Sequence, residues 1–495
     1  MGVPIVPGYD GAAQDDAKLT AEAEQVGYPL LVKPSAGGGG KGMHVVRSGA
    51  ELSAVLASAR REAHRSFGVD RLILERYLEG SRHVEIQVLF DGRGNGVHLG
   101  ERDCSAQRRN QKIVEEAPAL SVSPDLGERM GAAALKVAAS VGYQSAGTVE
   151  MLVTDAGEFF FLEMNTRLQV EHPVTEEVTG RDLVADQLRI AAGATIAELG
   201  LREPPRIRGH AIEARLYAED PEAGFLPATG RLVHVRWPDG VRVDTGVIEG
   251  DDVTDRYDPM LAKLIVHGAS RSDTLDRMRA AMASTSILGV RTNLRFLRWL
   301  LDQPPMRDGE VRTDTISKLT LPAAPTPGDE HWHAAASLLR APDPDAWSDG
   351  WRLNAPAVRR LRVGDEERSV ALRATDAALR SGVVRVGNIV HVDVEGQSLE
   401  FVLASPPTVE EAIRHAAAAG DGGAALLVAP MPGRVIAVHA ALGASVEERQ
   451  VIVVIEAMKM EHGVVAPRAG SLTRLEIEVG QQVERGDILG EIASN

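Results

Sequence analysis

Glu456-Ala457-Met458-Lys459-Met460 lies at the centre of an internal repeat near the end of this 495-residue chain. Aligning Ala429 with Ala466 also superimposes four further pairs of residues: Gly433 and Gly470, Gly443 and Gly480, Val446 and Val483, and Ile455 and Ile492. The repeat predicts two copies of one small all-β unit, with Lys459 in the turn that joins them. A lysine in a turn is usually a solvated surface group. Methionines gain nothing from an exposed turn, however, so the two that flank Lys459 indicate that another protein reads this turn.

This run resembles the attachment site of the biotinyl carrier family, in which a ligase couples biotin to the lysine of Ala-Met-Lys-Met. Lipoyl domains share the pseudo-symmetric fold but rarely carry methionine on both sides of the lysine. The resemblance covers residues 425–495 and implies biotin on Lys459 and a biotin protein ligase as a partner. One repeat position differs, because Arg449 stands where the second copy has Gly486. We expect a small cost there if the φ angle of Arg449 stays negative.

Composition excludes several classes of partner. The formal net charge of −16 argues against nucleic acid or an anionic membrane surface. No apolar run approaches the roughly 18 residues needed to span a bilayer, and no signal peptide is visible at the N-terminus. Cys104 is the single cysteine, so an intramolecular disulfide is impossible and a reducing compartment, the cytoplasm, is expected.

The periodicity of apolar residues predicts a multidomain α+β protein. In the first half, strands are expected at residues 83–89, 147–153 and 159–164, the last two as a hairpin, and a helix is expected at 180–192. Proline-rich stretches at 321–329 and 341–345 indicate a linker. Alternating apolar and polar residues between 351 and 405 predict a β-rich middle domain, followed by a flexible tether at Gly420–Gly423.

The first candidate for chemistry is the glycine-rich run Gly37-Gly38-Gly39-Gly40-Lys41-Gly42. The run does not match a Walker A loop. Ser35 occupies the position of that loop's first glycine, and Gly42 follows the lysine where Ser or Thr is required. A Rossmann loop requires a helix directly afterwards, whereas residues 43–47 have a β-like pattern. There remains a loop between two strands that closes over a nucleotide, or a glycine-rich loop with no ligand.

The second candidate is a polar strand face formed by Glu150, Glu163 and Asn165. Glu163 and Asn165 share one face of a strand, since side chains alternate with period two, and the hairpin brings the Glu150 strand alongside. Hard oxygen ligands of this kind suit Mg²⁺ shared with phosphates, while a polar face without a metal is the alternative. Arg167, Gln169 and Glu171 keep the same parity and line the same cleft if the chain stays extended. Strand 210–217 repeats the arrangement with Glu213 and Arg215.

These residues belong to a set of linked motifs that resembles the biotin carboxylase family, which has the ATP-grasp fold. The resemblance covers residues 1 to about 320 and rests on seven motifs: Lys33 with the glycine loop, Glu75-Arg76-Tyr77-Leu78, Arg82-His83-Val84-Glu85, Gln107-Arg108-Arg109-Asn110-Gln111-Lys112, Glu163-Met164-Asn165-Thr166-Arg167, Gln169-Val170-Glu171-His172-Pro173 and Glu213-Ala214-Arg215.

The resemblance implies a role for each matched residue. For the nucleotide, these are Lys33, Gly38, Gly39 and Gly40 at the phosphates, Glu75 and the backbone near Leu78 at adenine, and His83 and Gln107 at the nucleoside. For the metal, Mg²⁺ or Mn²⁺, they are Glu150, Glu163 and Asn165. For catalysis, they are Arg167 and Lys112 holding bicarbonate, Glu171 as the general base that deprotonates it, and Arg215 steadying the enolate-like oxygen of biotin. We expect the Glu171 carboxylate to be ionised at neutral pH, helped by Arg167.

Residues 349–354 (Asp-Gly-Trp-Arg-Leu-Asn) resemble the subunit-docking region of acyl-CoA carboxylase α-subunits, most closely the methylcrotonyl-CoA type. No carboxyltransferase domain follows, which implies a separate β-subunit and a hetero-oligomer. Compared with the family, the chain begins after an N-terminal α/β domain and an ATP-contacting lysine, so poor solubility and weak activity are expected. His331 and His333 could ligate zinc, but no third ligand is evident nearby, so linker polarity is preferred.

The sequence thus predicts an ATP-grasp domain (1–204), a biotin carboxylase C-terminal domain (205–321), a linker and β-rich docking domain (322–424) and a biotinyl carrier domain (425–495). Its expected function is ATP- and bicarbonate-dependent carboxylation of biotin on its own carrier domain, as the α-subunit of an acyl-CoA carboxylase. Two alternatives remain: another ATP-grasp carbon–nitrogen ligase that needs no biotin, and a carrier or assembly subunit whose carboxylase half is inactive. The sequence does not identify the acyl-CoA.

Overall fold

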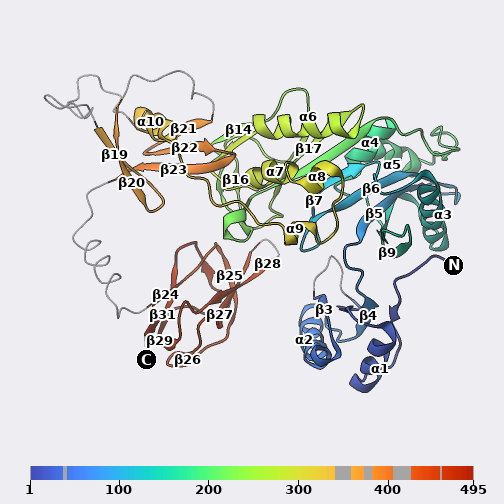
Figure 1. Cartoon of the computed structure of the whole chain (residues 1–495), viewed down its shortest axis with the longest axis horizontal. Coiled ribbons are helices and arrows are strands. Elements are labelled where there is room, and N and C mark those ends of the chain that lie inside the picture. Colours follow the sequence, from blue (N-terminus) through green and yellow to red (C-terminus); the bar gives the residue numbers. More distant parts are fainter. Residues whose placement is uncertain are drawn as a thin grey trace. The chain divides into compact units, whose positions relative to one another are not determined.

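The computed structural model describes residues 2–36, 42–339, 358–372, 382–404, 425–457 and 460–493. Gly38, Gly39, Gly40, Lys459, the docking motif at 349–354 and the tether at 420–423 lie outside these residues. The chain divides into two compact units, whose elements are labelled in Figure 1. Unit 1 comprises residues 1–215, 264–279 and 300–320, and unit 2 comprises residues 216–263, 280–299 and 321–495. No helix among the described residues is long and apolar enough to cross a membrane.

A small sheet with two helices opens unit 1. Its strand order is β1-β4-β2-β3, and its elements are β1 (Gly8–Tyr9), α1 (Asp16–Val26), β2 (Leu30–Pro34), β3 (His44–Val46), α2 (Gly49–Phe67) and β4 (Leu72–Arg76). Asp15 caps α1 by accepting a hydrogen bond from the Lys18 amide at 2.9 Å. In α2, Leu52, Leu56, Ala59 and Ala63 follow helical spacing and are buried. Strands β2 and β3 pair antiparallel, which confirms that two neighbouring strands flank the glycine-rich run.

The larger sheet of unit 1 carries the polar motifs. Six neighbouring strands of this eight-stranded sheet hold these motifs, in the order β10-β7-β6-β5-β8-β9. Their bounds are β5 (Arg82–Phe90), β6 (Gly96–Arg108), β7 (Gln111–Ala117), β8 (Ser145–Val153), β9 (Phe159–Asn165) and β10 (His210–Tyr217). The central strand β5 is buried along its whole length. Its residues Val84, Ile86, Val88 and Phe90 pack in one core with α3 (Pro124–Ser140). Because side chains alternate, His83, Glu85 and Gln87 face the opposite side of the sheet.

Two helices follow β9, one of which was not predicted. α4 (His172–Thr179) begins directly after Glu171, and α5 (Leu183–Ala191) corresponds to the predicted helix at 180–192. The expectation that the chain stays extended through Glu171 is wrong, because Glu171 is the N-cap of α4 with φ −84° and ψ 9°. Pro173 favours the first turn of a helix, and Val174 and Val178 are buried at the helical spacing of four. This signal was present in the sequence.

Several elements complete the part of the chain that precedes residue 321. Those with residues in both units are β17 (Met260–Gly268), α6 (Arg271–Ser284) and α7 (Leu294–Leu301). Unit 1 also contains α8 (Pro304–Asp308) and α9 (Thr315–Lys318). The short elements of unit 2 are β11 (Glu219–Asp220), η1 (Pro221–Ala223), β12 (Leu226–Pro227), β13 (Gly230–Arg231), β14 (His234–Arg236), β15 (Arg242–Thr245), β16 (Asp252–Val253) and β18 (Ser286–Leu288).

The β-rich middle domain consists of one sheet with a helix packed against it. Its sheet has the order β20-β19-β23-β22-β21, with strands β19 (Val358–Val363), β20 (Glu366–Ala371), β21 (Val383–Val386), β22 (Ile389–Val394) and β23 (Gln397–Leu403). Helix α10 (Asp329–Leu338) lies between the two predicted linker stretches, where no helix was predicted. Its Trp332 is fully buried and contacts Phe401 edge to face at 5.1 Å between ring centroids. His331 accepts a hydrogen bond from the Gly328 amide at 3.0 Å, and among the described residues neither His331 nor His333 belongs to a group that could hold a metal.

The carrier domain is a sandwich of two four-stranded sheets, β24-β31-β29-β26 and β28-β27-β25-β30. The first copy of the repeat supplies β24 (Ala425–Val428), β25 (Gly433–Val438), β26 (Ser445–Val446) and β27 (Val451–Ala457). The second copy supplies β28 (Met460–Val465), β29 (Gly470–Leu475), β30 (Gln482–Val483) and β31 (Ile488–Ala493). Each sheet therefore combines strands of both copies around one apolar core. Strands β27 and β28 pair with Ala457 opposite Met460, which confirms that a hairpin joins the copies.

Two pairs of equivalent turn and strand positions test the repeat in detail. A Cβ atom on Gly433 or Gly470 would lie 2.6 Å from the Glu456 carbonyl oxygen or 2.0 Å from that of Ala493, so both strands require glycine for their close approach. Arg449 and Gly486 donate equivalent backbone hydrogen bonds, to Ala466 at 2.8 Å and Ala429 at 2.9 Å. The expected negative φ of Arg449 is wrong: it is +66°, because the repeated turn imposes the left-handed conformation that Gly486 adopts at +93°.

Candidate active site

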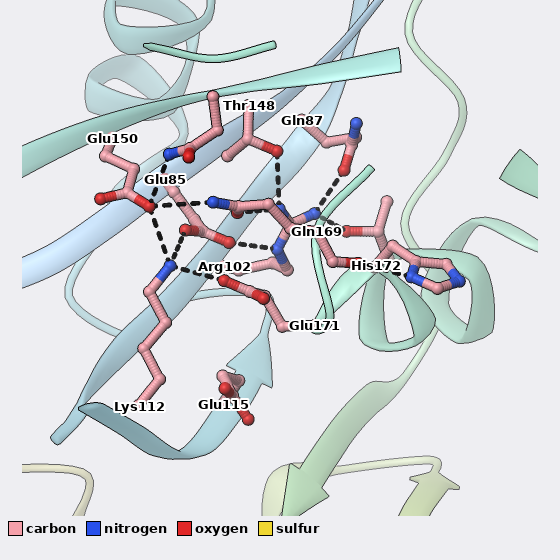
Figure 2. A network of polar contacts seen from close by, with 12 residues as sticks. Glu85, Gln87, Arg102, Lys112, Glu115, Thr148, Glu150, Gln169, Glu171 and His172 are labelled. Atoms are coloured by element: carbon pink, nitrogen blue, oxygen red, sulfur yellow. Dashed lines mark hydrogen bonds and ion pairs between the residues drawn. The ribbon is translucent and has the colours of Figure 1, made fainter. Parts of the chain in front are cut away.

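A buried polar network lies on the face of the large sheet opposite α3 (Figure 2). Lys112 on β7 is at its centre, and its Nζ atom lies 2.6 Å from Glu85 Oε2, 3.0 Å from Glu150 Oε1 and 2.5 Å from Glu171 Oε1. Burial opposes the charge of Lys112, but the surrounding carboxylates, Glu85 foremost, raise its pKa well above the ordinary lysine value. Lys112 therefore stays protonated and connects three acids from β5, β8 and the start of α4.

Glu171 lies between two cations. Its Oε1 contacts Lys112, and its Oε2 accepts a hydrogen bond from Arg215 Nη2 at 2.9 Å. Burial alone would raise the pKa of Glu171, but Lys112, Arg215 and Arg102 outweigh that effect and hold its pKa well below the usual range. Glu171 is therefore ionised at neutral pH, as predicted.

The cation predicted to assist Glu171 was wrongly identified. Arg167 is exposed and donates to the Leu168 carbonyl oxygen at 3.3 Å, and within the described part of the chain no ion pair joins it to Glu171. The extended chain ends at Asn165, so the strand parity that would have brought Arg167 and Glu171 to one face is lost. Lys112 and Arg215, which come from other strands, take that place.

The three expected metal ligands lie together. Glu150 on β8 is directly opposite Glu163 on β9, and the Asn165 amide lies 3.0 Å from Glu150 Oε1 and 3.4 Å from Glu163 Oε1. Burial would raise the pKa of Glu150, but His83, Lys112 and Gln169 reverse this and hold it well below its usual range. Two carboxylates and an amide that can turn its oxygen toward a bound ion fit a hard divalent cation.

The predicted nucleotide residues fall into two groups. His83 Nε2 lies 3.1 Å from Glu150 Oε2 and so belongs to the network, while Gln107 on β6 is paired directly opposite Lys112 on β7. Lys33 on β2 lies 2.6 Å from Glu75 on β4, and Leu78 follows that strand. Lys33 and Glu75 were predicted to serve different parts of ATP, whereas here they form an ion pair with each other.

Comparisons with known proteins agree with this geometry. Three family models match: the Carbamoyl-phosphate synthase L chain ATP binding domain at residues 1–199, the Biotin carboxylase C-terminal domain at 213–318 and Biotin-requiring enzyme at 426–492. The methylcrotonoyl-CoA carboxylase subunit alpha of Dictyostelium discoideum is 39% identical, covering 98% of this chain and 77% of that protein. The propionyl-CoA carboxylase alpha chain of Ruegeria pomeroyi is 35% identical, covering 99% and 81%. The chain belongs to the family of acyl-CoA carboxylase alpha subunits.

Solved structures support the carboxylase assignment of this alpha subunit. The biotin carboxylase domain of 2-oxoglutarate carboxylase from Hydrogenobacter thermophilus, in complex with MgADP, ADP and bicarbonate, is 44% identical with a TM-score of 0.61, covering 64% of this chain and 70% of that one. Biotin carboxylase from Campylobacter jejuni is 37% identical with a TM-score of 0.61, covering 64% and 71%. The chain is therefore an ATP-dependent ligase with a biotin carboxylase core of ATP-grasp fold, and its cofactors are biotin, ATP and Mg²⁺. Alpha subunits of this family use bicarbonate and work with a carboxyltransferase beta subunit.

Three residues of the alpha subunit's network had no predicted role. Glu85 and Arg102 are fully buried and bonded to each other at 2.6 Å. Glu115 on β7 lies 2.5 Å from Arg215 Nη2, and burial raises its pKa to about 7 although Arg215 opposes that shift. Glu85 shares the β5 face of His83, which was a usable signal. In the sequence, Arg102 and Glu115 cannot be told from ordinary solvent-exposed charged residues of a strand. Only their burial in the structure distinguishes them.

Proposed function

We propose that Glu171 is the base of bicarbonate activation, with Lys112 and Arg167 holding the anion and Arg215 steadying the enolate-like oxygen of biotin. The observation that carries this assignment is the position of Glu171 between Lys112 and Arg215 at the start of α4. Bicarbonate loses its proton to the Glu171 carboxylate, and the oxygen so exposed attacks the γ-phosphorus of ATP while ADP leaves. The resulting carboxyphosphate breaks to CO₂ and phosphate, a ring nitrogen of biotin gives its proton to that phosphate, and the same nitrogen bonds to the CO₂.

The depressed pKa of Glu171 bears directly on this role. A carboxylate paired with two cations is a weak base, because protonation would forfeit both interactions. An anionic substrate that draws Lys112 or Arg215 toward itself removes part of that stabilisation. Glu171 then becomes a better proton acceptor when bicarbonate is bound, so its basicity increases only when the substrate occupies the site.

We propose that Glu150, Glu163 and Asn165 hold Mg²⁺ or Mn²⁺, and that Lys33 and the glycines Gly38, Gly39 and Gly40 hold the ATP phosphates. Glu75 and the backbone near Leu78 are assigned to adenine, and His83 and Gln107 to the nucleoside. The metal, when bound, neutralises the charge that develops on the phosphates. The Lys33–Glu75 ion pair keeps the lysine positioned until phosphate oxygens compete for it.

Replacing Glu171 with glutamine tests the base. Glu171→Gln keeps the shape and removes the basicity, so bicarbonate-dependent ATP cleavage with free biotin should fall at least about a hundredfold while ATP binding survives. Asp182→Asn, at the cap of α5, is the control for losing a carboxylate nearby. Turnover of Glu171→Gln within a few-fold of the parent would overturn the assignment.

For the carrier domain, we propose that Lys459 bears biotin, attached by a biotin protein ligase. An avidin blot of protein made with such a ligase should be positive, and Lys459→Arg should abolish the signal. Lys318→Arg, an exposed lysine on α9, should leave it unchanged. A positive blot of Lys459→Arg would exclude this attachment site.

The acyl-CoA and the compartment belong to the same proposal. Methylcrotonyl-CoA is the substrate type favoured here, since relatives with that name are 37–39% identical whereas the propionyl-CoA relatives are 35% identical. Co-expression with candidate beta subunits, followed by acyl-CoA-dependent ATP cleavage, separates the two. A cytoplasmic location is proposed from the lone buried Cys104, and cell fractionation checks it.

A further inference from the structure

Arg102 on β6 satisfies all of its hydrogen-bond donors inside the protein. Its guanidinium is fully buried and has five N–H groups. Nε donates to Glu85 at 2.6 Å, Nη1 to Gln87 at 2.7 Å and Thr175 at 2.9 Å, and Nη2 to Thr148 at 3.1 Å and Gln169 at 3.4 Å. These five acceptors come from β5, β8, α4 and the segment that precedes α4, as Figure 2 shows in part.

Two of these partners, Glu85 and Gln169, also contact residues with proposed catalytic or metal-binding roles. Glu85 accepts from Arg102 with Oε1 and holds Lys112 with Oε2 at 2.6 Å, and Lys112 in turn contacts Glu171. Gln169 turns its amide oxygen to Arg102 and therefore presents its Nε2 to Glu150, a proposed metal ligand, at 2.9 Å. One guanidinium thus orients both the cation at the base and the acid at the metal.

A third interaction of Arg102, with Thr175, holds helix α4, which begins directly after Glu171. Thr175 lies one turn along α4 from Glu171, its N-cap, and Thr175 Oγ1 accepts from Arg102 Nη1. Replacing a whole buried ion pair by apolar residues of similar volume is often neutral for stability, whereas removing one partner alone is destabilising. If the Arg102–Glu85 pair served stability alone, apolar residues could replace it as a unit, but its contacts with Lys112 and Gln169 indicate a positioning role.

We infer that Arg102 is a positioning residue for carboxylation: it sets Lys112, Glu171 and Gln169 in their working geometry and supplies the third cation of the network without touching substrate. The inference rests on the proposed role of Glu171 as the base. In support, the positive charge of Arg102 is one of the causes that hold the pKa of Glu171 low, behind burial, which opposes it, and the charges of Lys112 and Arg215.

The test compares Arg102→Met and Arg102→Lys in the full chain, with Arg181→Met as the matched control. Arg181 forms an ion pair with the buried Asp186 at 2.7 Å and does not belong to the network. For Arg102→Met we expect kcat/KM for bicarbonate to fall about 10–100-fold, and the acid limb of its pH profile to rise by about one unit. Lysine keeps the charge but cannot reach five acceptors, so Arg102→Lys should keep the limb and lose about tenfold in kcat/KM. Arg181→Met should change the melting temperature alone.

A double-mutant cycle separates this inference from the assignment of the base. If Arg102 acts through Glu171, Arg102→Met should cause little further loss in a Glu171→Gln background. Equal fold-losses in both backgrounds, or an unmoved acid limb in Arg102→Met, would overturn the inference even where Glu171→Gln alone supports the base. If Arg102→Met does not fold, Arg102→Lys and Thr175→Val carry the test. Values of kcat/KM within twofold of the parent for both would also overturn it.

Discussion

The network in unit 1 and the carrier sandwich in unit 2 are built on opposite physical terms. In the network, Lys112, Glu171 and Arg102 are buried charges, each with several partners. In the carrier, the buried residues are almost all aliphatic, and the two copies of the repeat share one core. The carrier therefore depends on shape, and no residue of its apolar core has a proposed chemical role. The network depends on charge balance, and its buried charged residues are themselves the ones with proposed catalytic roles.

This difference predicts how each region responds to change. Coupled buried charges share partners, so the loss of one alters the proton affinity and orientation of the rest. Aliphatic packing instead responds locally to lost volume or backbone strain. Mutations in the network should change activity and pH dependence, whereas those in the apolar core and strands of the carrier should change stability alone.

The strongest test of this contrast is Lys112→Met. It leaves Glu85, Glu150 and Glu171 without their common cation, and removing one partner of a buried ion pair costs about 3–5 kcal/mol. Bicarbonate-dependent turnover should fall at least about a hundredfold, measured beside the melting temperature. Lys136→Met, on α3 across the sheet, is the control. A stable and active Lys112→Met would show that the network is not charge-coupled.

Acidification should affect unit 1 before the carrier. Glu150 and Glu171 have folded-state pKa values below the ordinary value of 4.5. Their stabilisation is thus complete above about pH 4.5 and is lost as the pH falls below it, at no more than about 1.4 kcal/mol per pH unit for each group. Glu115 has the opposite sign, because its pKa is raised to about 7 and stability is lost as the pH rises through that value.

Calorimetry of the full chain between pH 8 and pH 3.5 measures this difference. The unit 1 transition should lose melting temperature at both ends of the range, whereas the carrier transition should move less. Glu150→Gln should reduce the acid dependence. Parallel shifts of both transitions would contradict the contrast.

In the carrier, backbone crowding should matter more than charge. Gly470→Ala would place a Cβ atom 2.0 Å from the Ala493 carbonyl oxygen, so β29 and β31 must separate, at about 1–3 kcal/mol. Gly433→Ala has its nearest contact at 2.6 Å and should cost less. Calorimetry gives the order, and neither change should affect ATP cleavage with free biotin. The reverse order would show that the copies do not pack equivalently.

The sequence predicted the carrier more completely than the network, for a physical reason. A repeat specifies strands and turns at once, although the exchange of strands between the two sheets was not predicted from it. Glu150, Glu163 and Asn165 were predicted together because a two-residue period and a short hairpin are local. The cation beside Glu171 is set instead by which distant strand lies next to α4, and the sequence does not show this. The nearby Arg167 was therefore predicted as the partner of Glu171 in place of Arg215. The prediction that side chains alternate beyond Asn165 ignored Pro173, which favours a helix start. Nothing in the local sequence distinguishes Arg102 from a surface arginine.

The smallest expected effect lies where the two copies of the repeat differ. Arg449 adopts φ +66° and Gly486 φ +93° at equivalent turns, and a non-glycine residue in the left-handed region carries a penalty of about 1–2 kcal/mol. Arg449→Gly removes that strain but gives the unfolded chain more freedom, so the net gain should be about 0.5–1 kcal/mol. Gly486→Arg is the matched reverse and should cost a similar amount, measured as shifts of the carrier transition. If Arg449→Gly destabilises, the exposed arginine stabilises the turn through its side chain, and the two turns are equivalent in backbone geometry but not in energy.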